Sequence, residues 1–141
     1  MTSENHTDFI FPIRVYYEDT DAGGVVFYAN YLKFFERART EWLRHLGLHQ
    51  SVLVEQANIL FVVTYAQLDY KRPARLDDAL LIKTQIKKIG KASIDFEQIC
   101  MRQDEILVRC DIQIACVNAQ TFKISPIPNF VHSILLSDQD N

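Results

Sequence analysis

The residues best suited to acid/base or nucleophilic chemistry in this sequence are the carboxylates Glu18, Asp19 and Asp21. Gly23 and Gly24 follow them closely, and a segment with helical periodicity begins a few residues later. The first turn of a helix presents unpaired N–H groups that carry about half a positive charge. A substrate carbonyl held there would be stabilised as it became an oxyanion. The stretch therefore predicts a site where a carboxylate acts beside a polarising helix N-terminus.

The same residues also have a purely structural interpretation. Aspartate is common in turns before glycine, so Asp21 alone could simply cap the turn. Asp19 and Glu18 are expected to be solvated or structural. Gly23 and Gly24 would give the backbone freedom for a close approach of substrate.

One long amphipathic helix is expected after this turn. Asn30 is a suitable N-cap and Gly47 a natural C-terminal stop, which predicts a helix of ~16 residues, or ~24 Å. Apolar residues recur on one face at Tyr31, Phe35, Ala38, Trp42 and Leu46. Glu36 and Arg39 stand at i and i+3, so an ion pair is expected, with a wall of the binding site as the alternative.

Strand patterns occur on both sides of the long helix. Strand-like runs are expected at 13–18, 58–70, 80–87, 93–101 and 106–117. A weaker helical segment is expected at 50–56, residues 1–8 should be loose, and 126–141 forms a C-terminal tail. The order predicts one α+β domain over residues 1–141, with a five-stranded antiparallel sheet and one long central helix. A sheet covered on one face by one helix favours pairing with a second copy.

Composition narrows the functional classes. With 48% hydrophobic residues, 141 residues can bury a real core. A net charge of -3 argues against general nucleic-acid binding, which needs a basic face. The N-terminus lacks a signal-peptide pattern and no run approaches ~20 apolar residues, so a cytoplasmic protein without membrane insertion is expected. Three cysteines without a CxxC pair are expected to be reduced and structural: Cys100, Cys110 and Cys116.

Other catalytic motifs are missing from the sequence. The four histidines are scattered and form no HExxH pattern, so no metal site is expected. Nucleophile-elbow, P-loop and dinucleotide-binding patterns, GxSxG, GxxxxGK[ST] and GxGxxG, also do not occur. The carboxylate-rich turn is thus the strongest candidate for chemistry.

A longer pattern surrounds this turn. It comprises Tyr17-x-Asp19-x-Asp21-x-x-Gly24-x-Val26, Asn30-Tyr31 and Glu36-x-Ala38-Arg39, with weaker agreement at Phe61-Val62-Val63, at 70–78 and in the final strand. The pattern resembles the hotdog-fold thioesterases of the 4-hydroxybenzoyl-CoA thioesterase family, and most closely their Tol-Pal-associated acyl-CoA thioesterases. The resemblance implies a hotdog fold, in which the sheet wraps around the central helix, and a homodimer or homotetramer. It also implies hydrolysis of a fatty or aromatic acyl-CoA to free acid and CoA, without metal or cofactor.

The resemblance further implies roles for individual residues. Asp21 looks like the family's catalytic carboxylate, acting as nucleophile or as general base on water. The backbone N–H of Tyr28 looks like the donor that polarises the thioester carbonyl, and Gly24 belongs to the same catalytic motif. Many Tol-Pal-associated members carry a histidine where this chain has Tyr28, whereas the 4-hydroxybenzoyl branch has tyrosine. The mechanism expected here therefore depends on Asp21 and a backbone amide.

Substrate-binding residues are also implied by position. Val26, Tyr31 and Val63 are expected to contact the acyl-CoA. Basic residues near one turn are candidates for the CoA phosphates, although turn lysines are usually just solvated: Lys87, Lys88 and Lys91. Lys71 and Arg72 are rival candidates, because the loop after the long strand is also basic.

Two other functions compete with thioester hydrolysis. A hotdog dehydratase would need a histidine beside a carboxylate, and no histidine lies between Asp8 and Glu41. A non-catalytic acyl-carrier or Tol-Pal-associated adaptor would not need Asp21, so the presence of that carboxylate argues against it. An acyl carrier protein is a candidate partner under either interpretation.

Overall fold

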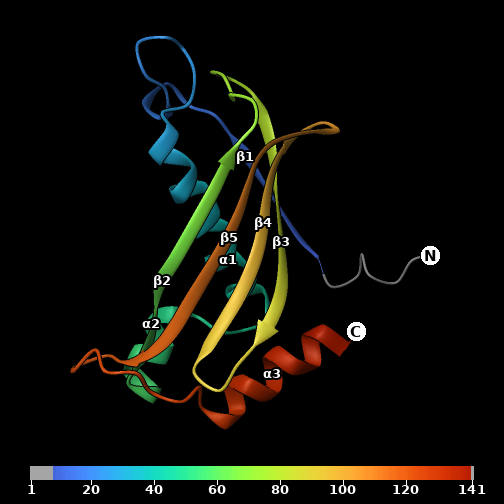
Figure 1. Ribbon diagram of the computed structural model, residues 1–141. Helices are drawn as coiled ribbons and strands as arrows, with labels where there is room; N and C mark the ends of the chain where they lie inside the picture. Colours follow the sequence, from blue (N-terminus) through green and yellow to red (C-terminus); the bar gives the residue numbers. More distant parts are fainter. Residues whose placement is uncertain (1–7, 141) are drawn as a thin grey trace.

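Five strands form one antiparallel sheet in the order β1-β3-β4-β5-β2 (Figure 1). The computed structural model describes residues 8–140. The strands are β1 (Phe9–Arg14), β2 (Ile59–Tyr70), β3 (Ala79–Ile89), β4 (Ser93–Arg102) and β5 (Glu105–Asn118). The long helix α1 (Tyr31–His45) lies against one face of this sheet, which curves around it. The expected five-stranded α+β architecture is therefore confirmed.

Helix α1 begins and ends close to the expected positions. The short 3-10 turn η3 (Tyr28–Asn30) leads directly into it. At the other end, Gly47 has φ 84°. The N–H groups of Gly47 and Leu48 donate to the carbonyls of Arg44 and Leu43. This is the hydrogen-bond pattern of a Schellman motif, which glycine permits because it has no Cβ.

The core lies between α1 and the inner face of the sheet. On the helix, the buried residues are Tyr31, Phe34, Phe35, Ala38, Arg39, Trp42 and Leu43. Alternate residues of the two central strands meet them, at Ile94, Phe96, Gln98 and Cys100 in β4 and at Cys110, Ile112, Ile114 and Cys116 in β5. All three cysteines are buried and free, as the sequence predicts. The alternation expected for the last strand is also confirmed.

The first strand lies earlier in the chain than expected, at Phe9–Arg14 rather than 13–18. It ends at Arg14, and a 3-10 turn, η2 (Tyr17–Asp19), replaces the predicted continuation to Glu18. The backbone N–H of Tyr16 donates to Asp19 Oδ2 at 2.9 Å, and Tyr17 is 82% exposed. Local hydrogen bonds to an aspartate therefore override the alternating pattern.

Three short segments complete the chain. The predicted helical segment at 50–56 is α2 (Gln50–Val52) followed by the π-helical turn η4 (Leu53–Ala57). The C-terminal tail contains α3 (Asn129–Asp140), whose Val131 and Leu135 are buried. No helix within residues 8–140 is long and apolar enough to span a membrane.

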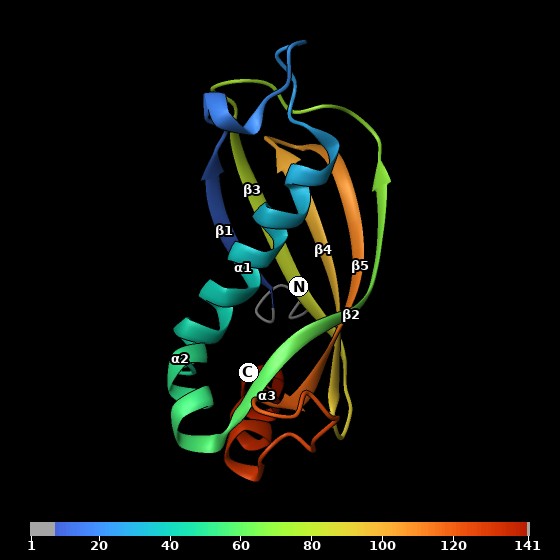
Figure 2. The ribbon, with the colours of Figure 1, turned by 90° about the vertical axis from the view of Figure 1, so that its left-hand side faces the viewer.

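Strand β2 differs from the other strands in how little of it is covered. Within residues 8–140 it is an edge strand that pairs only with β5, and α1 packs instead over β1 and β3. Figure 2 shows β2 on the flank of the sheet opposite β1. Val63 and Tyr70, whose register partners on β5 are buried, are themselves 49% and 46% exposed. The inner face of β2 is thus open along much of its length.

Candidate active site

Asp21 opens a tight turn between the β1 end and α1. Its Oδ1 accepts the N–H of Gly23 at 2.8 Å, and its carbonyl accepts the N–H of Gly24 at 3.0 Å. Gly24 has φ 78°, a left-handed conformation that a residue with a Cβ adopts only at a cost. The turn leaves the Asp21 carboxylate exposed to solvent, with Oδ2 free of hydrogen bonds to residues 8–140.

Asp19 is the buried carboxylate of the cluster, only 7% exposed. Its Oδ1 accepts the side-chain amide of Asn30 at 2.8 Å, and its Oδ2 accepts the N–H of Tyr16 at 2.9 Å. Its carbonyl accepts the N–H of Phe27 at 3.0 Å. Asp19 therefore joins the segment after β1, the loop and the start of the helix, and its role is structural. Asn30 stands at the expected N-cap position, but it makes no capping hydrogen bond there.

The backbone N–H of Tyr28 stands at the first position of η3. A helix start leaves such groups without an intrahelical acceptor, and this N–H forms no hydrogen bond with residues 8–140. The carbonyl of the same residue accepts the Tyr70 hydroxyl at 2.9 Å. The Tyr28 ring contacts Phe27, with ring centroids 4.7 Å apart, so the residue is held from both sides. The Phe27 carbonyl, which belongs to the same peptide as the Tyr28 N–H, accepts the N–H of Asn30 at 2.8 Å and holds this donor in place.

An aromatic cleft of about 260 Å³ lies beside this peptide. Its lining residues are Val26, Tyr28, Tyr31, Tyr70, Lys71, Arg72 and Pro73. The Tyr31 hydroxyl accepts the N–H of Ala74 at 2.9 Å, and the Tyr31 and Tyr70 rings meet edge to face at 5.7 Å. Burial raises the pKa of both phenols above the ordinary value. We therefore expect both hydroxyls to be neutral and the cleft to suit an apolar or aromatic group.

Asp21 is connected to the cleft through a short two-stranded segment. Its N–H donates to the Val25 carbonyl at 2.9 Å, and the next residue, Val26, lines the cleft. Val26 is held in turn by the bond from its N–H to the Ala74 carbonyl at 2.8 Å. The structure thus brings together four predicted site residues around one loop: Asp21, Gly24, Val26 and Tyr28. Tyr31, a fifth, lies on the cleft floor at the start of α1.

Two cations stand at the edge of this cleft. Lys71 Nζ lies 3.0 Å from Asp69 Oδ2, and Arg72 Nε lies 3.0 Å from Glu105 Oε2. Both pairs are substantially exposed, so each cation can also face a ligand. The alternative phosphate-binding residues named from the sequence are therefore the ones nearest the cleft.

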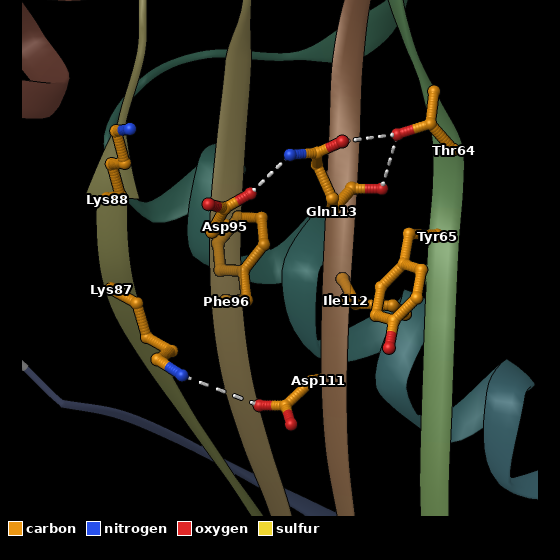
Figure 3. Close-up of a pocket in the computed structure, with 9 residues that line it drawn as sticks. All are labelled: Thr64, Tyr65, Lys87, Lys88, Asp95, Phe96, Asp111, Ile112 and Gln113. Carbon is orange, nitrogen blue, oxygen red and sulfur yellow. Dashed lines mark hydrogen bonds and ion pairs between the residues drawn. The ribbon is translucent and has the colours of Figure 1, made fainter.

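The predicted phosphate-binding lysines lie elsewhere in the chain. Lys87 and Lys88 stand near the end of β3, on a shallow hollow of about 760 Å³ on the outer face of the sheet (Figure 3). Lys87 Nζ is 3.8 Å from Asp111 Oδ1, and Lys91 follows in the next turn. β3 begins at Ala79 on the Asp21 side, so Lys87 lies ~26 Å further along an extended strand. One chain does not bring these lysines to Asp21.

Val63 also lies apart from the aromatic cleft. It lines a second cavity, of about 140 Å³, between α1, β2 and β5. The other lining residues are Glu36, Arg39, Thr40, Leu43, Gln50, Phe61 and Ile114. This cavity is further along α1 from the Tyr28 peptide.

The expected Glu36–Arg39 ion pair is wrong. Arg39 is buried, and its Nη1 donates to Gln98 Oε1 at 3.0 Å. Glu36 Oε2 instead accepts the Thr40 hydroxyl at 2.7 Å. Burial lowers the pKa of the Arg39 guanidinium, while Cys110 and Glu36 act in the opposite direction. The alternative, that these two residues form a wall of a binding site, agrees with their place on the second cavity.

Two contributions to the site were missed from sequence. Tyr70 fixes the Tyr28 carbonyl and forms a cleft wall, and its sequence signals were its place just before the basic loop and the weaker agreement with the family pattern at 70–78. The buried pair of Asp19 and Asn30 joins residues that are distant in sequence, so no local pattern reveals it. Among residues 8–140, no three His, Cys, Asp or Glu side chains are grouped as metal ligands would be.

Comparisons with known proteins identify the family and the fold. Residues 15–135 match the Thioesterase-like superfamily. The acyl-CoA thioesterase YbgC of Haemophilus influenzae is 47% identical over 123 residues, covering 87% of this chain and 90% of that protein. The acyl-CoA thioester hydrolase YbgC of Escherichia coli is 42% identical over 128 residues, covering 90% and 95%. A crystal structure of a probable thioesterase from Bartonella henselae superposes with a TM-score of 0.82 at 36% identity, covering 86% of this chain and 99% of that one.

Proposed function

The chain belongs to the thioesterase-like superfamily and has its hotdog fold, and on that premise we propose how its residues hydrolyse an acyl-CoA thioester. The products are a free carboxylic acid and CoA. We propose that Asp21 is the catalytic carboxylate and that the Tyr28 N–H binds the carbonyl oxygen. The observation that carries this proposal is the unpaired N–H of Tyr28 at the start of η3, beside the aromatic cleft and the exposed Asp21.

The chemistry follows from those two groups. The thioester carbonyl accepts the Tyr28 N–H, which stabilises the negative charge on that oxygen as the tetrahedral intermediate forms. Asp21 either attacks the carbonyl carbon directly or removes a proton from an attacking water. The carbon–sulfur bond then breaks, and CoA leaves as a thiolate that takes up a proton. Loss of one preorganised donor costs ~2.7–4 kcal/mol in comparable enzymes, so the amide contributes substantially.

Exchange of Asp21 for asparagine tests the proposal. Asp21→Asn keeps the shape of the side chain and removes the negative charge, and CoA release is measured over short, long and aromatic acyl-CoAs. We expect kcat to fall ~100-fold or more, which corresponds to at least ~2.7 kcal/mol. Glu18→Gln, at an exposed carboxylate of the neighbouring turn, is the matched control and should leave kcat within ~2-fold. Equal rates for native protein and Asp21→Asn would reject the role of Asp21.

A second measurement distinguishes attack by Asp21 from activation of water. A single turnover in ¹⁸O-water is followed by mass analysis of the peptide that contains Asp21. Direct attack forms an anhydride, and attack of water on its aspartyl carbonyl leaves label in the Asp21 carboxylate, whereas water activation places the label only in the product acid. Label in the Asp21 carboxylate after one turnover therefore requires direct attack by Asp21.

The phosphates at the nucleotide end of CoA need cationic ligands, and two sets of basic residues are candidates. Lys71 and Arg72 line the cleft itself, which supports them as phosphate ligands within one chain. Lys87 and Lys88 remain candidates only where a second chain brings them near. We expect the Lys71→Ala/Arg72→Ala variant to raise KM for acyl-CoA ~10-fold. It should leave the KM for an N-acetylcysteamine thioester, which lacks the nucleotide, almost unchanged. If only Lys87→Ala/Lys88→Ala raises KM, the assignment is reversed.

We also propose that the protein is at least a homodimer that pairs through β2. The support is the long free edge of β2 and its exposed Val63 and Tyr65. An antiparallel pairing of two such edges would set the β3–β4 turn of one chain, with its lysines, beside the Asp21 end of the other. Sedimentation equilibrium should give at least twice the chain mass of 16.4 kDa. A monomer at micromolar concentration would contradict the proposal.

Location and partners are further proposals. We propose a cytoplasmic enzyme that can receive acyl groups from acyl carrier protein and acts in association with the Tol-Pal system. Retention of acyl carrier protein by an Asp21→Ala variant, combined with undetectable hydrolysis by the native protein, would instead favour a non-catalytic adaptor. Cell fractionation and pull-down from the native host measure both points.

A further inference from the structure

Arg39 is a rigidly held cation that the proposed mechanism does not use. Its side chain is only 7% exposed, and its Nη1 donates to Gln98 Oε1 at 3.0 Å. Gln98 is fully buried and donates to the Phe35 carbonyl at 3.0 Å and to the Thr84 hydroxyl at 2.9 Å. Because Gln98 is fixed by these bonds, the guanidinium of Arg39 is fixed as well.

The charge of Arg39 lacks a carboxylate partner. Among residues 8–140, no aspartate or glutamate oxygen lies within 4.0 Å of its guanidinium, and the bond to Gln98 is its one hydrogen bond. A guanidinium carries five N–H donors. Burying such a charge without a counter-ion is costly, so its retention calls for a compensating role.

Arg39 is one of the residues that line the second cavity. The cavity measures about 140 Å³, well above the ~10–15 Å³ that one water molecule needs. Phe61 and Val63 form apolar walls, while Glu36 and Thr40 supply polar groups on the α1 side. Glu36 and Arg39 thus place one negative and one positive group on the same small space.

The cavity lies where the far end of a bound acyl chain would reach. From Tyr28 to Arg39 the chain advances ~16 Å along the helix axis. Leu32, Glu36 and Thr40 follow Tyr28 at successive intervals of four and therefore share one face of α1. Leu32 is 41% exposed, and the inner face of β2 opposite is largely uncovered. An extended acyl chain can lie along this strip.

We propose that the second cavity binds a hydroxyl group at the distal end of the acyl chain, so that the enzyme prefers ω-hydroxyacyl-CoA of medium length. This inference rests on the proposed thioesterase function. A hydroxyl oxygen accepts an N–H of Arg39 and its proton is donated to the Glu36 carboxylate, which gives each charged group one further hydrogen bond. A methyl terminus leaves Arg39 unpaired, and a carboxylate terminus is repelled by Glu36.

The test is a ratio of specificities measured within each enzyme. For matched acyl-CoA pairs of equal carbon number, with and without an ω-hydroxyl, the native protein should show a kcat/KM ratio of ~10 or more at the length that reaches Arg39. Arg39→Met, which keeps side-chain length and removes the donors, should bring the ratio to about one. Because both substrates are measured with the same protein, a general loss of activity in a variant lowers both kcat/KM values and cancels in their ratio.

Two further variants complete the experiment. Arg37→Met changes an exposed arginine of the same helix and should leave the ratio at the native value. Glu36→Gln, also at an exposed position, should lower the ratio several-fold and decides the matter if Arg39→Met does not fold. A native ratio near one at every chain length overturns the inference while leaving the thioesterase proposal intact. Absence of CoA release from any substrate would instead reject the thioesterase proposal.

Discussion

Replacement of Asp19 by alanine should destabilise the protein more than any exposed substitution in the catalytic loop. Asp19 is buried, and it accepts hydrogen bonds from the Asn30 side chain at 2.8 Å and from the Tyr16 N–H at 2.9 Å. Asp19→Ala leaves both donors without their acceptor. Hydrogen bonds to a charged group contribute ~1.5–3 kcal/mol each, so the expected loss is ~3–6 kcal/mol. A domain of this size has a total stability of ~5–15 kcal/mol.

The assay is urea unfolding followed by far-UV circular dichroism. We expect the unfolding midpoint to fall strongly in Asp19→Ala with little change in the slope m. Glu18→Ala, at the exposed neighbouring carboxylate, should stay within ~0.5 kcal/mol of the native protein. The double variant Asp19→Asn/Asn30→Asp exchanges donor and acceptor, and it should recover more than half of the loss.

Activity provides a second readout of the same pair. Since the Asp19 carbonyl holds the Phe27 N–H, movement of Asp19 should displace the adjacent Tyr28 peptide. Under conditions where Asp19→Ala remains folded, kcat should therefore fall more than KM rises. A stability loss below ~1 kcal/mol together with native kcat would refute this reasoning, because it would mean that the buried bonds position nothing.

Three other expectations concern the backbone, the core and the thiols. Gly24→Ala should cost ~1–2 kcal/mol through backbone strain alone, since φ is 78° and a Cβ would meet nothing within 4 Å; an unchanged thermal midpoint would disagree. Phe35→Ala should cost ~3–5 kcal/mol, measured by denaturant unfolding, because the ring is fully buried. Burial raises the thiol pKa to about 12 for Cys100 and Cys110 and to about 11 for Cys116, against an ordinary value of 9.0. As the pH rises, the thiols of the unfolded chain therefore ionise before those of the native protein. The free energy of unfolding should be unaffected below pH ~9 and should fall above it. The native thiols should also react slowly with DTNB at pH 8.

The elements with strong periodicity could be predicted from sequence. Alternation along β5 is carried by residues that all face the core, so its period of two is visible in one dimension. The end of α1 was predictable because Gly47 supplies the left-handed conformation that a helix terminus needs. The resemblance of the pattern that contains Asp21 and Gly24 also led to the correct family and fold.

Features that depend on contacts distant in sequence could not be predicted. Asparagine is a residue type favoured at helix N-caps, yet the Asn30 side chain donates a hydrogen bond to Asp19, because the folded loop brings that carboxylate within 2.8 Å. Arg39 has the spacing for an ion pair with Glu36, but it points into the core toward Gln98 on β4. Tertiary burial overrides local spacing at both positions. The same limit applies to Lys87, whose distance from Asp21 is set by the length of β3.

The strand order also has a consequence for synthesis of the chain. β2 is made before β3 and β4, but its only neighbour within residues 8–140 is β5, the last strand to leave the ribosome. At ~5–20 residues per second, β2 waits for seconds as an unpaired strand in which most residues are apolar or aromatic. During that interval, neighbouring nascent chains on the same messenger RNA can associate through their β2 strands before β5 is available to pair with β2 in each chain. Chaperone protection of this interval should therefore matter more to yield than the stability of the finished fold.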